Sequence, residues 1–291
     1  MVLPPVLRHW QVSLGAEHGF SEQGSSAAVE EYTGDGFSVS VERDTESRFL
    51  VTFSGLAAFS VSQAQHSIVC HPFSAEVPAA TLEHLLLDQM VPRIIGQLGN
   101  LVLHAAGLAH KDASILLLGD TGRGKSTLAT ALYTHALGLL GDDAMVITLQ
   151  DGRPMARAVY PSLRLLPDSR IQLLPRDTVH HPIGNQTRKE RIALPFMALP
   201  EPDYQPIAGI FILDAALPGG GVSLCRLGPA EACMALTSNS FALDPADNRS
   251  ASDRLQIAAA LVRQAPAYIL RYPRDYAVLP QVCAAIVDAV A

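Results

Sequence analysis

The sequence predicts an α/β fold built on a largely buried sheet and preceded by a small β-rich region. Short runs near the N-terminus alternate apolar and polar residues, which is the period of a half-buried strand. After residue 72, apolar residues recur at helical spacing and are separated by short continuous apolar runs. One of these runs leads through a glycine-rich turn into a helical pattern. The order strand, turn, helix, strand indicates an α/β unit.

The N-terminal region, residues 1–72, is expected to contain strands at 37–42 and 49–53, where β-branched and aromatic residues alternate with polar ones. The second region, residues 73–291, begins with a helical pattern over 79–98 that Pro92 is expected to kink. We therefore place the boundary between the two domains after residue 72.

Strand and helix patterns then follow each other along the second region. The runs 101–106 and 114–118 are expected to be adjacent strands, 126–137 a helix and 144–149 another strand. The polar segment 178–191 is expected to be a mobile loop. Further strands are predicted at 207–213, 222–227 and 267–272, and further helices at 229–236, 252–264 and 280–290.

Composition excludes several classes of protein. Of the 291 residues, 48% are hydrophobic and 17% charged, so the chain can bury a core and is not a disordered protein. The formal net charge of -7 and the lack of a long basic run argue against a nucleic-acid partner. No apolar run reaches the roughly 18 residues of a spanning helix, and the N-terminus has no leader pattern. We expect a cytoplasmic protein whose scattered cysteines are free thiols.

The segment Gly119–Ser126 fits the pattern G-x-x-x-x-G-K-[ST] of a phosphate-binding loop. Its glycines let successive backbone N–H groups surround phosphate oxygens, and the following helix adds its positive end. Lys125 is expected to reach the β- and γ-phosphates, and the Ser126 hydroxyl to bind Mg²⁺. The predicted ATP-binding residues are Gly119, Asp120, Thr121, Gly122, Arg123, Gly124, Lys125, Ser126 and Thr127.

Phosphoryl transfer also needs acidic side chains for the metal and for the proton of an alcohol acceptor. Asp142 and Asp143 follow a predicted strand and could divide these roles, although an Asp-Asp pair is also common in surface turns. His104 lies on the strand before the loop; a lone histidine there is usually a packed core residue. His180 and His181 are interpreted as loop residues because no carboxylate or cysteine stands at ligand spacing.

Together, His104, the loop and the pair Asp142–Asp143 resemble the catalytic domain of the HPr kinase/phosphorylase family, over roughly residues 82–149. Further segments are similar to a divergent branch that includes kinases of the C-terminal serine in lasso-peptide precursors. These segments are Leu101-Val-Leu-His-Ala-Ala-Gly, Leu116-Leu-Leu-Gly, Tyr160-Pro-Ser-Leu-Arg-Leu-Leu-Pro-Asp and Leu270-Arg-Tyr-Pro-Arg. The resemblance implies a P-loop kinase core with a mixed central sheet.

The resemblance also implies residue roles. Asp142 would take the proton of the acceptor serine, Asp143 would assist the metal or the substrate, and His104 would support Asp142 near the transferred group. Thr127 stands where the family has a glutamate, and Asp168 is a weak substitute for a metal-binding glutamate of a later motif. The cluster Arg188, Lys189 and Arg191 is either a loop that closes over the phosphates or a solvated group of charges.

The function expected from these features is that of an ATP- and Mg²⁺-dependent kinase acting on a serine of a peptide or small protein. Two alternatives stay open: a kinase of free serine or another metabolite, and a non-catalytic protein that binds a partner under the control of ATP. A guanine-binding Asn-Lys-x-Asp motif is missing from the sequence, which disfavours a signalling GTPase. We expect no membrane association, and a homo-oligomer of unspecified order.

Overall fold

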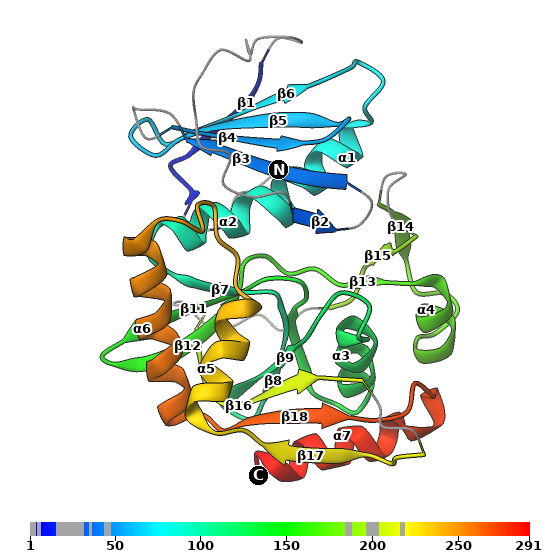
Figure 1. The fold of residues 1–291 in the computed structure, drawn as a ribbon. Helices are drawn as coiled ribbons and strands as arrows, with labels where there is room; N and C mark the ends of the chain where they lie inside the picture. Colours follow the sequence, from blue (N-terminus) through cyan, green and yellow to red (C-terminus); the bar gives the residue numbers. More distant parts are fainter. Residues whose placement is uncertain are drawn as a thin grey trace. The chain divides into compact units, whose positions relative to one another are not determined.

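A computed structural model describes residues 4, 7–15, 32–34, 37–43, 48–183, 188–195, 204–215 and 219–291. Contacts divide the chain into two compact units (Figure 1). The first comprises residues 1–97, 183–188 and 242–248, and the second comprises 98–182, 189–241 and 249–291. Each unit is described by itself.

The first unit contains a six-stranded sheet in the order β1-β6-β5-β4-β3-β2. β1 pairs with β6 in parallel and all other neighbours are antiparallel. The segments predicted at 37–42 and 49–53 are the strands β3 and β4. Phe53 and Phe59 are fully buried, and their rings meet edge to face at 5.7 Å. The strands are β1 (Gln11–Leu14), β2 (Tyr32–Gly34), β3 (Phe37–Arg43), β4 (Arg48–Phe53), β5 (Ala57–Ser62) and β6 (Ser67–Pro72).

The helical segment predicted over 79–98 continues through Pro92 as α1 (Ala79–His84), a π-helical turn (Leu85–Met90) and α2 (Val91–Gln97). Proline has no N–H, and its ring crowds the carbonyl four residues earlier. The wider π turn directly before Pro92 gives that ring room, and the helical structure continues to Gln97.

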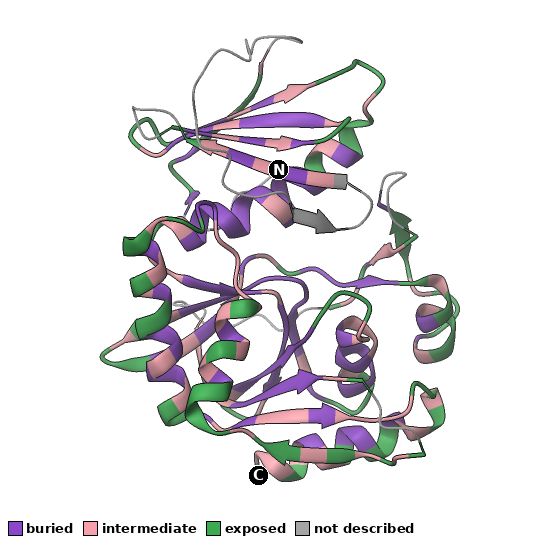
Figure 2. Ribbon diagram, viewed as in Figure 1, coloured by how far each residue is buried: buried purple, intermediate pink, exposed green. Residues whose placement is uncertain are grey.

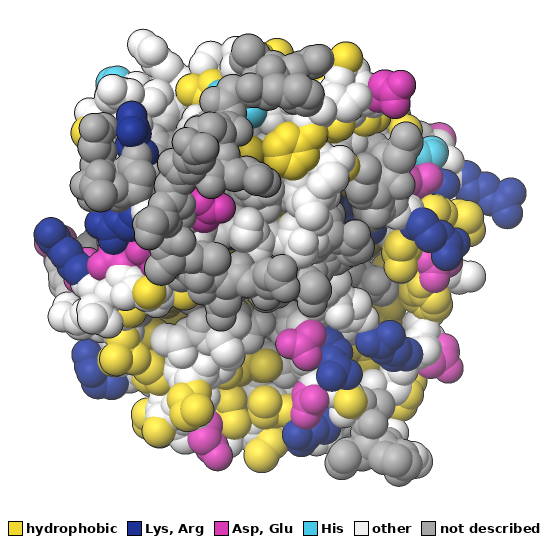
Figure 3. All heavy atoms as spheres, turned by 45° about the horizontal axis from the view of Figure 1, so that its top comes forward, with side chains coloured by type: hydrophobic (Ala, Val, Ile, Leu, Met, Phe, Trp, Pro, Cys, Tyr) yellow, Lys and Arg dark blue, Asp and Glu magenta, His cyan; other side chains and the backbone are white. Residues whose placement is uncertain are grey.

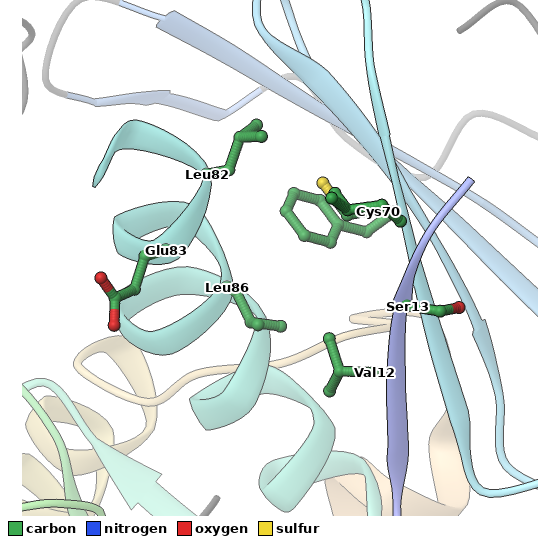
Figure 4. A pocket seen from close by; sticks show the side chains of 8 residues that line it. Val12, Ser13, Cys70, Leu82, Glu83 and Leu86 are labelled. Carbon is green, nitrogen blue, oxygen red and sulfur yellow. The ribbon is translucent and has the colours of Figure 1, made fainter. Parts of the chain in front are cut away.

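This helical segment groups with the first sheet, whereas the sequence placed it after the domain boundary at residue 72. Leu82 and Leu86 line a small apolar hollow together with Val12, Phe59 and Cys70. In Figure 4, Leu86 and Val12 point toward one another, whereas Glu83 and Ser13 point away. The apolar face of the helix is therefore turned toward the sheet.

The second unit contains a mixed nine-stranded sheet in the order β10-β8-β9-β16-β12-β11-β7, with β18 beside β16 and β17 beside β18. The segment predicted at 222–227 is β17, and its partner is β18 rather than the preceding strand β16. The strands are β7 (Leu101–Leu103), β8 (Ala105–His110), β9 (Ala113–Leu118), β10 (Gly138–Gly141), β11 (Met145–Gln150), β12 (Arg153–Ala158), β16 (Gln205–Leu213), β17 (Ser223–Arg226) and β18 (Ala267–Arg271).

Strand direction brings several chain segments to one edge of this sheet. β8 is antiparallel to both β9 and β10, so β9 and β10 run in the same direction. β16 is parallel to β9, and β18 is parallel to β16. The carboxyl ends of these four strands and the start of β8 therefore share an edge. Gly119, Asp142, Asp214 and Tyr272 follow the four strands, and His104 precedes β8.

Both faces of the second sheet are covered, which explains its continuous apolar runs. Ile115 and Leu117 of β9 pack in a cluster with α3 (Lys125–Thr134) and α7 (Leu279–Ala289). Leu116 and Leu118 belong to the cluster on the other face, with α5 (Pro229–Ser238) and α6 (Asn248–Gln264). The central strands are accordingly buried (Figure 2).

The polar segment 178–191, expected to be a mobile loop, instead contributes two strands to a small sheet in the order β13-β15-β14. Its strands are β13 (Arg164–Leu165), β14 (His180–Pro182) and β15 (Glu190–Ile192), and α4 (Pro167–Leu173) follows β13. Strands this short and polar show almost no alternation of apolar and polar residues. They are held by backbone hydrogen bonds, which do not require a particular residue pattern. Residues 184–187 lie outside the described part of the chain.

Three further features concern membrane-spanning helices, surface charge and the cysteines. Within the part of the chain that the structure describes, no helix is long and apolar enough to cross a membrane. On the face in Figure 3, the visible Lys and Arg side chains are dispersed and do not gather into one patch. The four cysteines are free thiols, of which Cys70 and Cys283 are buried.

Candidate functional site

The glycine-rich loop Gly119–Ser126 joins β9 to α3, with the strand before it and the helix after it that the sequence predicted. Gly119, Gly122 and Gly124 have φ values of 136°, 79° and 95°, a region that side chains with a Cβ rarely adopt. Gly124 is the residue directly before α3. The loop thus has the backbone freedom to turn its N–H groups inward at the start of a helix.

Gly119 is also required by packing, which gives a first testable prediction. A Cβ at Gly119 would lie 2.7 Å from the Leu213 carbonyl oxygen of β16, whereas a Cβ at Gly122 would meet nothing within 4 Å. Both positions have positive φ. We expect Gly119→Ala to lower the free energy of unfolding by about 1–3 kcal/mol more than Gly122→Ala, measured by urea denaturation. Equal losses in the two variants would contradict a steric role for Leu213.

Lys125 is buried at the start of α3, and its ammonium group faces the loop. Nζ donates to the carbonyl oxygens of Gly119 at 2.5 Å and Asp120 at 3.2 Å. An ammonium group has three donors, so these two bonds leave one for an anion held by the loop. Burial lowers the pKa of Lys125, and the negative charges of Asp142 and Asp143 oppose that shift.

The acidic pair lies directly after β10. Asp142 and Asp143 are 1% and 4% exposed, so the surface turn that the sequence left open is excluded. Asp142 Oδ1 accepts the Asp143 N–H at 2.9 Å. Asp142 Oδ2 is buried and has no hydrogen-bond partner in the described part of the chain. A buried carboxylate oxygen without a partner is costly, which makes it a candidate functional atom.

Asp143 is held by Arg164, a residue of β13 that sequence reasoning did not select. Arg164 Nε donates to Asp143 Oδ2 at 2.6 Å, and both side chains are buried. Asp143 has φ of 72°, which is unusual for a residue other than glycine. Burial alone would raise the pKa of Asp143, but the charge and the hydrogen bond of Arg164, with the charge of Lys189, hold it well below its usual range.

The pKa of Asp142 moves the other way. Burial and the neighbouring charge of Asp143 raise it from 3.8 to about 6, against the opposing effects of Lys189, of the nearby Ser126 hydroxyl and of Arg164. The pKa values of the two adjacent carboxyl groups are therefore far apart: Asp143 is ionised at all moderate pH values, whereas Asp142 can exchange a proton near neutrality. Such a separation is typical of acid–base sites.

His104 does not lie inside one strand, because the segment predicted at 101–106 is divided into β7 and β8 at this residue. β7 pairs with β11 while β8 pairs with β9 and β10, and the His104 N–H bonds instead to the Asn239 carbonyl. The His104 Nδ1–H donates to the Asp143 carbonyl oxygen at 3.0 Å. Burial and Lys125 lower the pKa of His104 to about 4, so its ring is neutral and Nε2 is an acceptor at neutral pH.

The three basic residues that the sequence left either as a closing loop or as a solvated group of charges have different surroundings in the structure. Lys189 lies close enough to both acidic side chains and to Lys125 to shift their pKa values. Arg191 is in β15, paired in register with Arg164 and His181. Arg188 is exposed and groups with the first unit.

The remaining predicted residues occupy the rim of the loop and the helix after it. Asp120 and Thr121 are exposed, and Arg123 forms an ion pair with Asp120 at 3.6 Å. Thr127 Oγ1 contacts Ser169 Oγ at 3.0 Å. Asp168 accepts a hydrogen bond from the Tyr276 hydroxyl at 3.4 Å. His180 and His181 are exposed on β14, and the described residues contain no group of three or more His, Cys, Asp or Glu placed to hold a metal.

Two further residues of the site were missed in the sequence. Arg164 interrupts an apolar run from Leu163 to Leu166, and a charge in such a run could have marked it as buried and paired. Arg274 follows β18, and its Nη2 donates to the Gly122 carbonyl oxygen at 2.6 Å. Arg274 ends the segment Leu270-Arg-Tyr-Pro-Arg that carries part of the resemblance, but its contact with the loop depends on strand order.

No family model and no curated protein matches the chain. Among solved structures, it is similar to the HPr(Ser) kinase/phosphatase from Coxiella burnetii, with 8% sequence identity and a TM-score of 0.33. The match covers 64% of this chain and 94% of the other. The mixed α/β architecture follows from the chain's own strands and helices, and the structural neighbour is a distant one.

Proposed function

We propose that the protein is a kinase that uses ATP and Mg²⁺ to phosphorylate a serine hydroxyl of a peptide or small protein. The observation that carries the proposal is the buried, unpartnered Oδ2 of Asp142, whose pKa is near 6, at the same sheet edge as the glycine-rich loop. The finer proposal, from the sequence resemblance, is that the acceptor is the C-terminal serine of a lasso-peptide precursor.

ATP would place its triphosphate against the N–H groups of the loop, and the remaining donor of Lys125 would contact a phosphate oxygen. The residues present fit a magnesium ion, because the Ser126 hydroxyl and the Asp143 carboxylate are oxygen ligands and Mg²⁺ takes few protein ligands beside phosphate. When bound, the ion would neutralise charge that develops on the phosphate oxygens. Arg164 keeps Asp143 ionised and in place for this role.

In the proposed step, the serine oxygen forms a bond to the γ-phosphorus while the bond from that phosphorus to the bridging oxygen of ADP breaks. The hydroxyl proton passes to Asp142 Oδ2. Asp142 suits this role because its raised pKa makes the ionised form a stronger base than an ordinary carboxylate. The neutral ring of His104 holds the turn through its bond to the Asp143 carbonyl.

The proposed base predicts the pH dependence of the reaction. Asp142 must be ionised, so kcat/KM for the acceptor is expected to rise tenfold per pH unit below about pH 6 and to level off above it. His104 does not titrate in this range because its pKa is lowered to about 4. Initial rates in constant-ionic-strength buffers from pH 5 to pH 8.5 measure the profile. A rate that is flat between pH 5 and pH 7 would exclude Asp142 as the base.

The direct test is transfer itself. The protein is incubated with ATP, Mg²⁺ and peptides that end in serine, and the products are read by mass spectrometry, with the serine-to-alanine peptide and the Lys125→Ala variant as controls. Gain of one phosphate mass on the serine peptide supports the proposal. Phosphorylation of free serine or another metabolite instead would favour the small-molecule kinase. ATP binding with no transfer to any acceptor would favour a non-catalytic, ATP-controlled protein.

A further inference from the structure

The segment Tyr272–Asp275 lies beside the glycine-rich loop, at the carboxyl end of β18. Arg274 Nη2 donates to the Gly122 carbonyl oxygen at 2.6 Å. A Cβ at Gly124 would lie 3.6 Å from the Tyr272 hydroxyl oxygen. One side chain of this short segment therefore bonds to the tip of the loop, and a second lies near the residue that precedes α3.

This segment is fixed at both ends. Arg271, the last residue of β18, forms an ion pair with Asp214 at 2.7 Å, and Asp214 directly follows β16. On the other side, the Asp275 N–H donates to the Pro273 carbonyl at 2.8 Å, and Asp275 Oδ1 accepts the Ala277 N–H at 2.9 Å. A contact residue supported in this way is already positioned before a ligand arrives.

Strand order places Arg274 and the proposed base on opposite sides of the loop. Asp142 follows β10, which is separated from β9 by β8. Arg274 follows β18, which is separated from β9 by β16 on the other side. Neighbouring strands are about 4.8 Å apart, so β10 and β18 each lie roughly 10 Å from β9, in opposite directions. Lys189, Arg164 and Lys125 are among the charges that act on the acidic pair.

Phosphoryl transfer proceeds roughly in line, so the acceptor and the departing ADP lie on opposite sides of the transferred group. If Asp142 faces the acceptor, the nucleoside must extend away from β10, toward β18. The guanidinium group of Arg274 is exposed there and is held at the loop by one of its five donors. Its flat faces can stack on a nucleobase, as arginine does in nucleotide recognition.

We propose that Arg274 contacts the nucleoside of the bound nucleotide, with its guanidinium plane against the base and Tyr272 beside the same end of the loop. This inference rests on the proposed function, because it assumes that the loop holds a nucleoside triphosphate. It assigns nucleotide recognition, as distinct from phosphate recognition, to the segment after β18.

The test compares two ligands that share the phosphate chain. Isothermal titration calorimetry in Mg²⁺ buffer measures the Kd of the full chain for ATP and for inorganic tripolyphosphate. Arg274→Ala is expected to weaken ATP binding by about tenfold and to leave tripolyphosphate binding within about twofold. The matched control is Arg226→Ala, which removes an exposed arginine from β17, away from the loop, and is expected to change neither Kd.

The outcomes separate the two proposals. If wild-type protein binds neither ligand, the proposed function fails and the inference fails with it. If wild-type protein binds both equally well, or if Arg274→Ala weakens both equally, Arg274 does not contact the nucleoside and the proposed function stands. An unchanged Kd for ATP in Arg274→Ala overturns the inference as well. Arg274 is exposed and its loss creates no cavity, so the variant is expected to fold.

Discussion

Asp142→Asn is expected to lower the rate of phosphoryl transfer by about 10²–10⁴-fold, because it removes the proposed base, and to leave ATP binding within a few-fold of wild type. Asparagine keeps the Oδ1 oxygen that accepts the Asp143 N–H, so the turn after β10 is preserved. It removes a carboxyl group whose pKa lies near 6. Single-turnover transfer to the serine peptide and calorimetric binding of ATP measure the two effects separately.

The stability of Asp142→Asn distinguishes loss of a base from loss of the fold. The pKa of Asp142 is raised from 3.8 to about 6 by folding, so its stabilising contribution is fully present below about pH 4 and is lost as the pH rises through 6. Asparagine does not ionise, so it does not lose stability as the pH rises through 6. The variant is therefore expected to unfold at the same temperature as wild type, or at a higher one, at pH 8. A variant that transfers phosphate at the wild-type rate, or that melts well below wild type at pH 8, would contradict the role of Asp142.

The sequence predicted the parts of the site that consecutive residues form. The strand at 114–118, the loop Gly119–Ser126 and the helix after it are consecutive, and each leaves its own signal: a buried apolar run, glycines at fixed positions and helical spacing. The acidic pair was predicted from its position after a strand and from the resemblance. Its burial could not be predicted, because it depends on residues far away in the sequence.

The residues that the sequence did not reveal act through pairing between distant segments. His104 falls at a break between two strands because β7 and β8 have different neighbours, which no run of residues around 101–106 records. Arg164 reaches Asp143 through the small sheet that contains β13. The strands around 178–191 are too short and polar to show a period. The missing information was strand order in each case.

Arg164→Met is expected to be the most destabilising single change at the site. The Arg164–Asp143 pair is buried, with side chains 8% and 5% exposed. Methionine preserves much of the arginine volume but leaves Asp143 as a buried charge without its main partner. Breaking a buried ion pair in this way costs about 3–5 kcal/mol of unfolding free energy. Urea denaturation at pH 7.5 measures the loss.

A matched control and the pH dependence separate this mechanism from lost packing. Arg271→Met removes an arginine from the pair with Asp214, whose side chains are 30% and 38% exposed, and is expected to cost only about 0–1 kcal/mol.

Arg164 lowers the pKa of Asp143, so the stability that the pair supplies is present above the ordinary carboxyl pKa of 3.8 and is lost as the pH falls through the lowered value. In Arg164→Met, Asp143 is left buried without its guanidinium and will accept a proton more readily. The difference between wild type and Arg164→Met should therefore shrink as the pH is lowered from 7.5 to 5. A loss that is the same at both pH values would mean that Arg164 contributes packing rather than charge.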